Sequence, residues 1–147
     1  MITDNKPKHI GIIACSYEGA ALCYKTICNE GSNFLGEHAH PEVSLHTLPL
    51  SEYMYFIHRD EWEGVAGLMH TTAQKLISIG AEILVCPDNT IHKVYLEANR
   101  GLTVPWLHIA EEVSKVAKLN QFKTIGILGT KYLMESRVYP DVFDNQD

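Results

Sequence analysis

Long apolar runs and clusters of basic residues are both missing from this sequence. No segment reaches the ~18 consecutive apolar residues that a membrane span requires, and residues 1–8 lack the apolar core of a signal peptide. We therefore expect a cytoplasmic protein that makes no membrane contact. The formal net charge is −6, from 12 Lys and Arg against 18 Asp and Glu. This excess of acid argues against a nucleic-acid partner, because phosphate binding needs a basic surface.

The motifs of nucleotide-binding and metal-binding proteins are also missing. Gly126 and Gly129 lack the third glycine of G-x-G-x-x-G, and no G-x-x-x-x-G-K-[ST] segment occurs. His38 and His40 form an H-x-H pair, but a metal site would need further ligands that only the fold could bring to them. We therefore expect no bound nucleotide and no metal ion.

A disulfide framework is not expected either. The four cysteines are Cys15, Cys23, Cys28 and Cys86. In a cytoplasmic chain they should be reduced thiols. Cys23 and Cys28 fall within an apolar helical pattern, so we interpret them as core residues, since a free cysteine behaves as a small buried hydrophobe.

The order of the predicted elements favours an α/β fold with a mainly parallel sheet. Short apolar runs predict strands at 8–15, 43–48, 83–86, 106–109 and 124–128. Helical spacing predicts helices at 19–28, 60–79, 91–99 and 111–119, with a further helix beginning at 131. Residues 31–42 are predicted to form a loop. Strands that alternate with helices indicate a three-layer sandwich, with helices on both faces of the sheet.

Any chemistry should lie where these strands end, because open parallel sheets bind ligands beyond the carboxyl ends of their strands. The segments that follow predicted strands are 14–16, 49–51, 87–90 and 129–131. Residues 10–16 and 125–131 also resemble each other, since both are apolar strands with glycine second that run into a small polar turn. This internal similarity predicts that a second, related half begins near Lys123.

The segment from Cys86 to His92 (CPDNTIH) is the most distinctive of these. A buried strand ends there, and Asp88, Asn89 and Thr90 follow at once. Backbone N–H groups at the start of the next helix would suit a carboxylate ligand. The alternative interpretation is that Asp88 or Asn89 merely caps that helix.

Four segments resemble motifs of the aspartate/glutamate racemase family. Residues 80–93 (GAEILVCPDNTIHK) are similar to the family signature G-A-[DE]-x-[IL]-[VI]-x-x-[CT]-N-T-x-H. Residues 10–16 (IGIIACS) resemble its I-G-[IL]-[LI]-G-G-M start, and residues 105–111 (PWLHIAE) resemble P-x-[LI]-x-[IM]-x-[ED]. Residues 126–135 (GILGTKYLME) resemble the segment that opens the second domain of the family.

The resemblance implies a fold, a reaction and a set of site residues. Family members have two similar α/β halves facing each other across a cleft, and they use neither pyridoxal phosphate nor a metal. Each half offers one acid/base group, usually a cysteine thiol, so that a proton leaves one face of the α-carbon and another arrives on the opposite face. We therefore expect residues 1–119 to form a first racemase-like domain and 120–147 to begin a second.

The implied site residues can be named position by position. Asp88 stands at the catalytic position, and Cys15 could supply a thiol. The expected substrate-binding residues are Ser16, Asn89, Thr90 and Thr130. The expected substrate is a small amino acid or dicarboxylic acid, and the expected assembly is a homo-oligomer. A non-catalytic module that binds such acids, or a related maleate isomerase or decarboxylase, is the alternative.

The sequence departs from the family pattern in three places. Asp88 replaces the usual Cys or Thr, and a carboxylate with an ordinary pKa near ~4 is a weak base unless burial raises that pKa. Cys15 lies where the family has glycine, and it could equally be a small packed residue. Cys86 is expected to point into the core. The G-C-T-E-like motif of the second half does not occur in these 147 residues, so we expect the lone chain to carry an incomplete active site.

Overall fold

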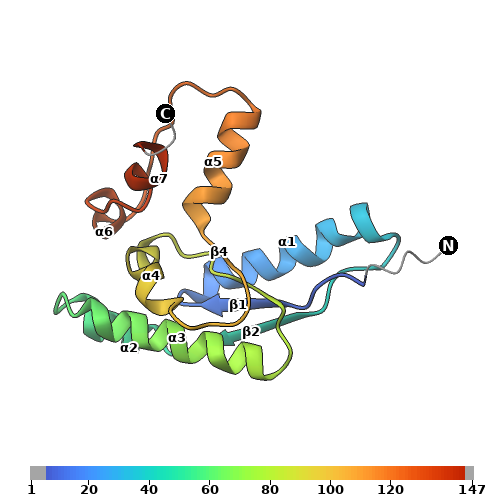
Figure 1. The fold of residues 1–147 in the computed structure, drawn as a ribbon, viewed down its shortest axis with the longest axis horizontal. Coiled ribbons are helices and arrows are strands. Elements are labelled where there is room, and N and C mark those ends of the chain that lie inside the picture. The colour runs from blue at the N-terminus through green and yellow to red at the C-terminus, as the bar shows by residue number, and fades with distance from the viewer. Residues whose placement is uncertain (1–5, 145–147) are drawn as a thin grey trace.

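Four parallel strands form the centre of the protein. The computed structural model describes residues 6–144, and its strands are β1 (Ile10–Ala14), β2 (Val43–Thr47), β3 (Ile83–Val85) and β4 (Trp106–Leu107). They pair in the order β2-β1-β3-β4, so β1 lies inside the sheet, with Ile12 opposite Leu45 on one side and Val85 on the other. The chain must cross over the sheet to make each parallel pair, and helices provide these crossovers (Figure 1).

Helices cover both faces of this sheet, which confirms the predicted α/β sandwich. The side chains of β1 alternate between the faces, as a buried strand requires. Ile12 and Ala14 pack with Ala20 of α1 (Tyr17–Leu35). Ile13 belongs instead to the main core, with residues of α2 (Leu50–Ile57) and α3 (Trp62–Ser78). The helices α2 and α3 lie side by side on the face opposite α1 (Figure 1).

The remaining helices follow β3 and β4. A 3-10 helix, η1 (Thr90–Val94), leads into the short helix α4 (Tyr95–Ala98), and β4 is followed by α5 (Ile109–Leu119). Two short helices, α6 (Lys131–Met134) and α7 (Pro140–Asp144), then return beside α5. Ala110, Leu133, Val138 and Tyr139 form a small second core there. This core spans the predicted domain boundary between residues 119 and 120, and that boundary stays a prediction.

Two of the predicted helices have different limits in the structure. The helix α1 continues to Leu35, through residues predicted as a loop. Gly31 permits this continuation, because a Cβ atom there would lie 2.8 Å from Cα of His40. The predicted start at Asp60 is also wrong, since α3 begins at Trp62. Asp60 has the left-handed φ of 57°, and its carboxylate accepts a hydrogen bond from the Trp62 indole.

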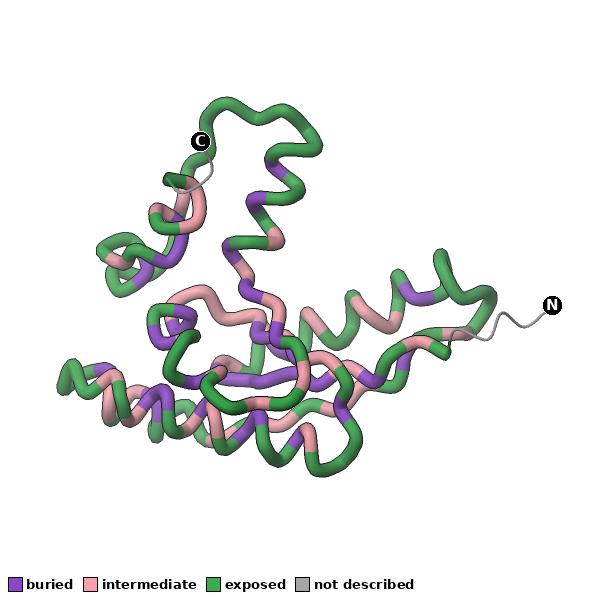
Figure 2. The backbone as a smooth tube through the Cα atoms, in the orientation of Figure 1, coloured by how far each residue is buried: buried purple, intermediate pink, exposed green. Residues whose placement is uncertain are grey.

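Three further predictions failed. The helix α2 is absent from the predicted helices, although in the structure it begins immediately after Pro49. Residues 124–128 form no strand and pair with none of the strands among residues 6–144, so the predicted fifth strand is wrong. The helix predicted from 131 ends at Met134 and is followed by the separate α7. Figure 2 shows the chain between α5 and α6 as almost wholly exposed.

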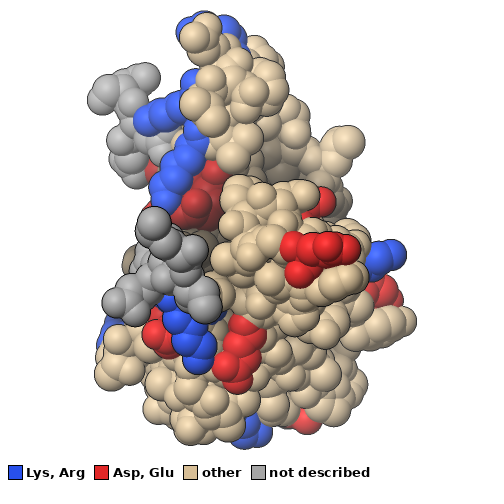
Figure 3. Space-filling view, turned by 90° about the vertical axis from the view of Figure 1, so that its right-hand side faces the viewer, with Lys and Arg blue, Asp and Glu red and all other residues tan. Residues whose placement is uncertain are grey.

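The surface carries both signs of charge. Acidic and basic side chains are interspersed on the face shown in Figure 3, with uncharged areas between them. Within residues 6–144, none of the helices has both the length and the apolar character that crossing a membrane would require.

Gly11 and Gly126, the corresponding glycines of the two similar segments, provide a test of the sheet packing. A Cβ atom on Gly11 would lie 2.8 Å from Leu84 Cδ2 and 2.9 Å from Ala81 Cβ, whereas a Cβ atom on Gly126 would meet nothing within 4 Å. We predict that Gly11→Ala lowers the free energy of unfolding by about 1–3 kcal/mol, because it overpacks the core. The control Gly126→Ala should change it by less than about 0.5 kcal/mol. Urea unfolding measures both, and equal losses would contradict the packing described.

Candidate functional site

The carboxyl ends of β1 and β3 bring most of the predicted site residues together. The two strands are parallel neighbours, so Cys15 and Ser16, which follow β1, lie beside Asp88, which follows β3. Ser16, Asp88, Asn89 and Thr90 are each half-buried. Asp88, Asn89 and Thr90 are therefore at the edge of the sheet, reachable from solvent, and not enclosed in the core.

Asp88 is the most strongly engaged group at this edge. Its Oδ1 accepts a hydrogen bond from the Thr90 backbone N–H at 3.2 Å. Its carboxylate also accepts from the Cys15 thiol and from the backbone of Ile91 and Ser16. Burial raises the pKa of Asp88, these hydrogen bonds lower it, and the net result is a pKa above the ordinary value for aspartate. Burial thus outweighs the lowering effect expected from a helix start, and Asp88 is a stronger base than an exposed carboxylate.

The same geometry corrects one expectation about the backbone. The Thr90 N–H was expected to point outward toward a bound carboxylate, but it donates to Asp88 instead. This contact joins a side chain to the backbone two residues later, which is the local turn that aspartate commonly makes. The N-cap residue of η1 is Asn89, and its side chain makes no capping hydrogen bond, so neither Asp88 nor Asn89 is the side-chain cap of the alternative interpretation.

Cys15 lies directly behind Asp88. It is 4 % exposed and packs in the main core with Ile13 and Tyr53. Burial, followed by the nearby charge of Asp88, raises the pKa of the Cys15 thiol, so the thiol stays protonated at neutral pH and donates to the carboxylate. Cys86 is buried in the same core, as expected, and burial raises its pKa as well.

Asn89, Thr90 and Thr130 connect the sheet edge to the small second core. The Tyr139 hydroxyl donates to Asn89 Oδ1 at 2.6 Å, and the hydroxyls of Thr90 and Thr130 lie 3.2 Å apart. Thr130 also caps α6 by accepting from the Leu133 N–H at 3.4 Å. Residues 130–139 therefore border the site on the side away from the sheet, with Thr130 exposed to solvent.

His92 is buried and contacts the backbone of Asp88. The sequence assigned it no role. Its Nδ1 donates to the Asp88 backbone carbonyl at 2.7 Å, and the side chain is 3 % exposed. Burial lowers the pKa of His92 to about 4, so the ring is neutral at pH 7. The signal available in the sequence was the position of His92 in the N-T-x-H motif, four residues after Asp88.

No metal centre accompanies these groups in the described part of the chain. Residues 6–144 hold no cluster of three or more His, Cys, Asp or Glu side chains placed to bind a metal ion. His38 and His40 lie on an exposed segment, and the His40 ring contacts the carbonyl of Pro41.

Comparison of sequences finds a relative among amino-acid racemases. No protein-family model matches the chain. The chain is 37% identical over 70 residues to the broad specificity amino-acid racemase RacX of Bacillus subtilis (strain 168). The match covers 48% of this chain and 30% of RacX.

Comparison of structures gives matches along nearly the whole chain. A candidate Asp/Glu racemase from Yersinia pestis superposes with a TM-score of 0.87 at 28% identity, over 95% of this chain and 61% of that one. An aspartate racemase homologue from Pyrococcus horikoshii OT3 superposes with a TM-score of 0.82 at 25% identity. This match covers 94% of this chain and 61% of that one. The aspartate racemase of Picrophilus torridus, at 18% identity and a TM-score of 0.78, shares the fold.

These likenesses confirm the resemblance to the aspartate/glutamate racemase family that the sequence motifs indicate. The chain spans about three-fifths of the length of these solved structures, from 59% to 61%, and 30% of RacX.

The buried neutral His92 predicts a specific pH dependence of stability. Below the ordinary pKa of 6.5 an unfolded chain binds a proton on this ring, whereas the folded protein does so only near pH 4. The free energy of unfolding should therefore fall as the pH drops from 6.5 to 4, by about 3 kcal/mol from this group. In His92→Gln the free energy of unfolding, measured with urea at each pH, should lack this part of its dependence on pH.

His58→Gln is the matched control, because it removes an exposed imidazole. The free energy of unfolding of this variant should depend on pH as that of wild type does. A His92→Gln protein with the same pH dependence as wild type would show that the ring is not held neutral in the folded state.

Proposed function

We propose that this chain forms one wall of an amino-acid racemase site of the aspartate/glutamate type, with Asp88 as the acid/base group of that wall. The observation that carries the proposal is the position and state of Asp88. It follows β3 at the carboxyl edge of a parallel sheet, in the motif position of the catalytic residue, and burial raises its pKa. A raised pKa matters because proton removal from an α-carbon needs a base stronger than an ordinary carboxylate.

In the proposed reaction Asp88 takes the α-proton and the bond electrons remain on the α-carbon as a carbanion. A proton delivered to the opposite face then completes the inversion. The Cys15 thiol acts as a positioning group, because it donates to Asp88 and fixes the direction of the carboxylate. Ser16, Asn89, Thr90 and Thr130 are proposed to hold the substrate carboxylate with hydroxyl and amide donors.

The proposal needs no pyridoxal phosphate and no metal, since the charge on the carbanion is stabilised by the hydrogen-bond donors that hold its carboxylate. It does need a second acid/base group, because one base can return a proton only to the face from which it took it. Cys15 cannot fill that role, as its thiol is bound to Asp88 on the same wall. The second group must come from polypeptide that faces this wall, and a partner copy in a homo-oligomer is one source.

Exchange of the α-proton in heavy water tests this proposal. Wild-type protein should catalyse deuterium incorporation into aspartate or glutamate, with retention of configuration where Asp88 acts alone and with inversion where a second group is supplied. Asp88→Asn should lower the exchange rate at least about 100-fold, the usual scale of acid/base catalysis. The exposed Asp60→Asn is the control and should leave the rate unchanged.

Proton NMR measures deuterium incorporation, and a chiral assay measures configuration. The proposal fails if folded wild-type protein exchanges none of the four L- and D-substrates, or if Asp88→Asn exchanges them at the wild-type rate.

A binding module for small carboxylic or amino acids is the second candidate. The observation that favours it is that several polar groups of the site already bond one another, as in the pairs Tyr139–Asn89 and Thr90–Thr130. Saturable binding of aspartate or glutamate without any α-proton exchange would support the module over the racemase.

A further inference from the structure

A cavity lies beside the Asp88 site and takes no part in the proposed racemase reaction. Its volume is about 240 Å³, and it is bounded by η1 and α4, by the first turn of α5 and by the chain entering α7. Its polar lining comes from His92, Lys93, Tyr95, His108, Glu111, Arg137 and Asp141. None of these seven residues takes part in the proposed racemase reaction.

Two histidine nitrogens of the cavity lining lack a hydrogen-bond partner among the described residues. The imidazole rings of His92 and His108 meet edge to face, with centroids 4.9 Å apart. His92 Nε2 and His108 Nδ1 are both buried and have no hydrogen-bond partner among residues 6–144. Because His92 Nδ1 donates to the Asp88 carbonyl, Nε2 of this neutral ring carries a lone pair. A buried acceptor without a donor is unfavourable, so a ligand with an N–H or O–H group would complete the cavity.

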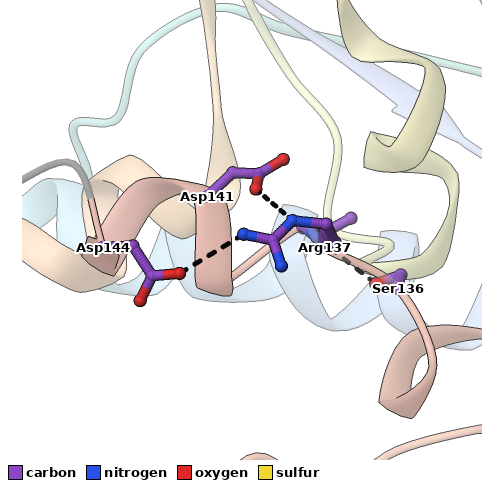
Figure 4. A network of polar contacts seen from close by, with 5 residues as sticks. Ser136, Arg137, Asp141 and Asp144 are labelled. Carbon is purple, nitrogen blue, oxygen red and sulfur yellow. Dashed lines mark hydrogen bonds and ion pairs between the residues drawn. The ribbon is translucent and has the colours of Figure 1, made fainter.

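The charged groups at the rim decide which donor fits. Arg137 lies between two carboxylates, with its Nε 2.5 Å from Asp141 and its Nη2 3.3 Å from Asp144 (Figure 4). The Lys93 ammonium, also at the rim, lies 3.9 Å from the Trp62 ring centroid and 3.9 Å from Asp60. Both cations are therefore already engaged by the protein.

Glu111 is the carboxylate of the cavity lining that can pair with a charged ligand. It is exposed and makes no ion pair within the described residues. Burial lowers the pKa of His108, and the nearby charge of Glu111 opposes that shift. Burial raises the pKa of Tyr95, and the charge of Glu111 raises it further. An anionic ligand would be repelled by Glu111, whereas a cation would be attracted by this charge.

We propose that this cavity is a binding site for a small protonated amine. The ammonium N–H donates to His92 Nε2 and its charge faces Glu111, while Leu96, Val138 and Val142 contact a short alkyl part. The site is distinct from that of the Asp88 carboxylate, and the two are connected through the two nitrogens of the His92 ring.

The test uses propylammonium as the probe and butyrate as a control of similar size and opposite charge. Each is titrated into the protein while the imidazole ¹⁵N signals of His92 and His108 are followed by NMR. Propylammonium should shift the His92 Nε2 signal saturably, in the direction of an accepted hydrogen bond, and butyrate should not. Binding of butyrate instead, or no change at His92 with propylammonium in the millimolar range, would overturn the proposal and leave a cavity filled by water only.

Two variants on one helix separate specific binding from general attraction. Glu111→Gln should weaken propylammonium binding roughly tenfold, since it removes the facing charge. Glu112→Gln removes the neighbouring charge, which lies outside the cavity and pairs with Lys115, and should leave the affinity unchanged. Equal effects of both variants would overturn the proposal. The result does not depend on the racemase proposal, because neither variant touches the residues of that reaction.

Discussion

The competition between burial and hydrogen bonding at the Asp88 carboxylate is the constraint on which the proposed site depends. Removal from water raises the pKa of this group, while the Cys15 thiol and backbone N–H groups stabilise its charged form. The donors of Thr90 and Ile91 are local, whereas Cys15 and Ser16 reach Asp88 because β1 and β3 are adjacent and parallel and end at the same edge. A carboxylate with fewer donors would have a still higher pKa, and one in open water would be too weak a base for an α-carbon.

The rest of the structure holds this arrangement in place. The alternation of β1 buries Ile12 against one layer of helices and Ile13 against the other, so the strand cannot shift by one residue without exposing the core. His92 donates a hydrogen bond to the Asp88 backbone carbonyl and so holds that backbone in place. The hydrogen-bonded pairs Tyr139–Asn89 and Thr90–Thr130 link the small second core to the sheet edge.

The sequence predicted the four strands of the sheet, because β-branched runs and strand ends are local signals. It predicted the carboxyl-edge grouping of Cys15, Ser16 and Asp88 for the same reason. It could not predict which parallel neighbour each strand has, nor that residues 124–128 lack one, since pairing depends on distant segments. The continuation of α1 through Gly31 depends on a contact with His40. The roles of His92 and His108 depend on burial, which a single sequence does not reveal.

The pKa of Asp88 in the folded protein can be measured, and it links the fold to the proposed reaction. Titration of its carboxyl ¹³C signal by NMR should give a value above the ordinary one of 3.8. Cys15→Ala should raise the pKa further, because it removes a hydrogen bond that stabilises the carboxylate. A pKa at or below the ordinary value, or a lower pKa in Cys15→Ala, would contradict the account of a buried, thiol-supported base at the end of β3.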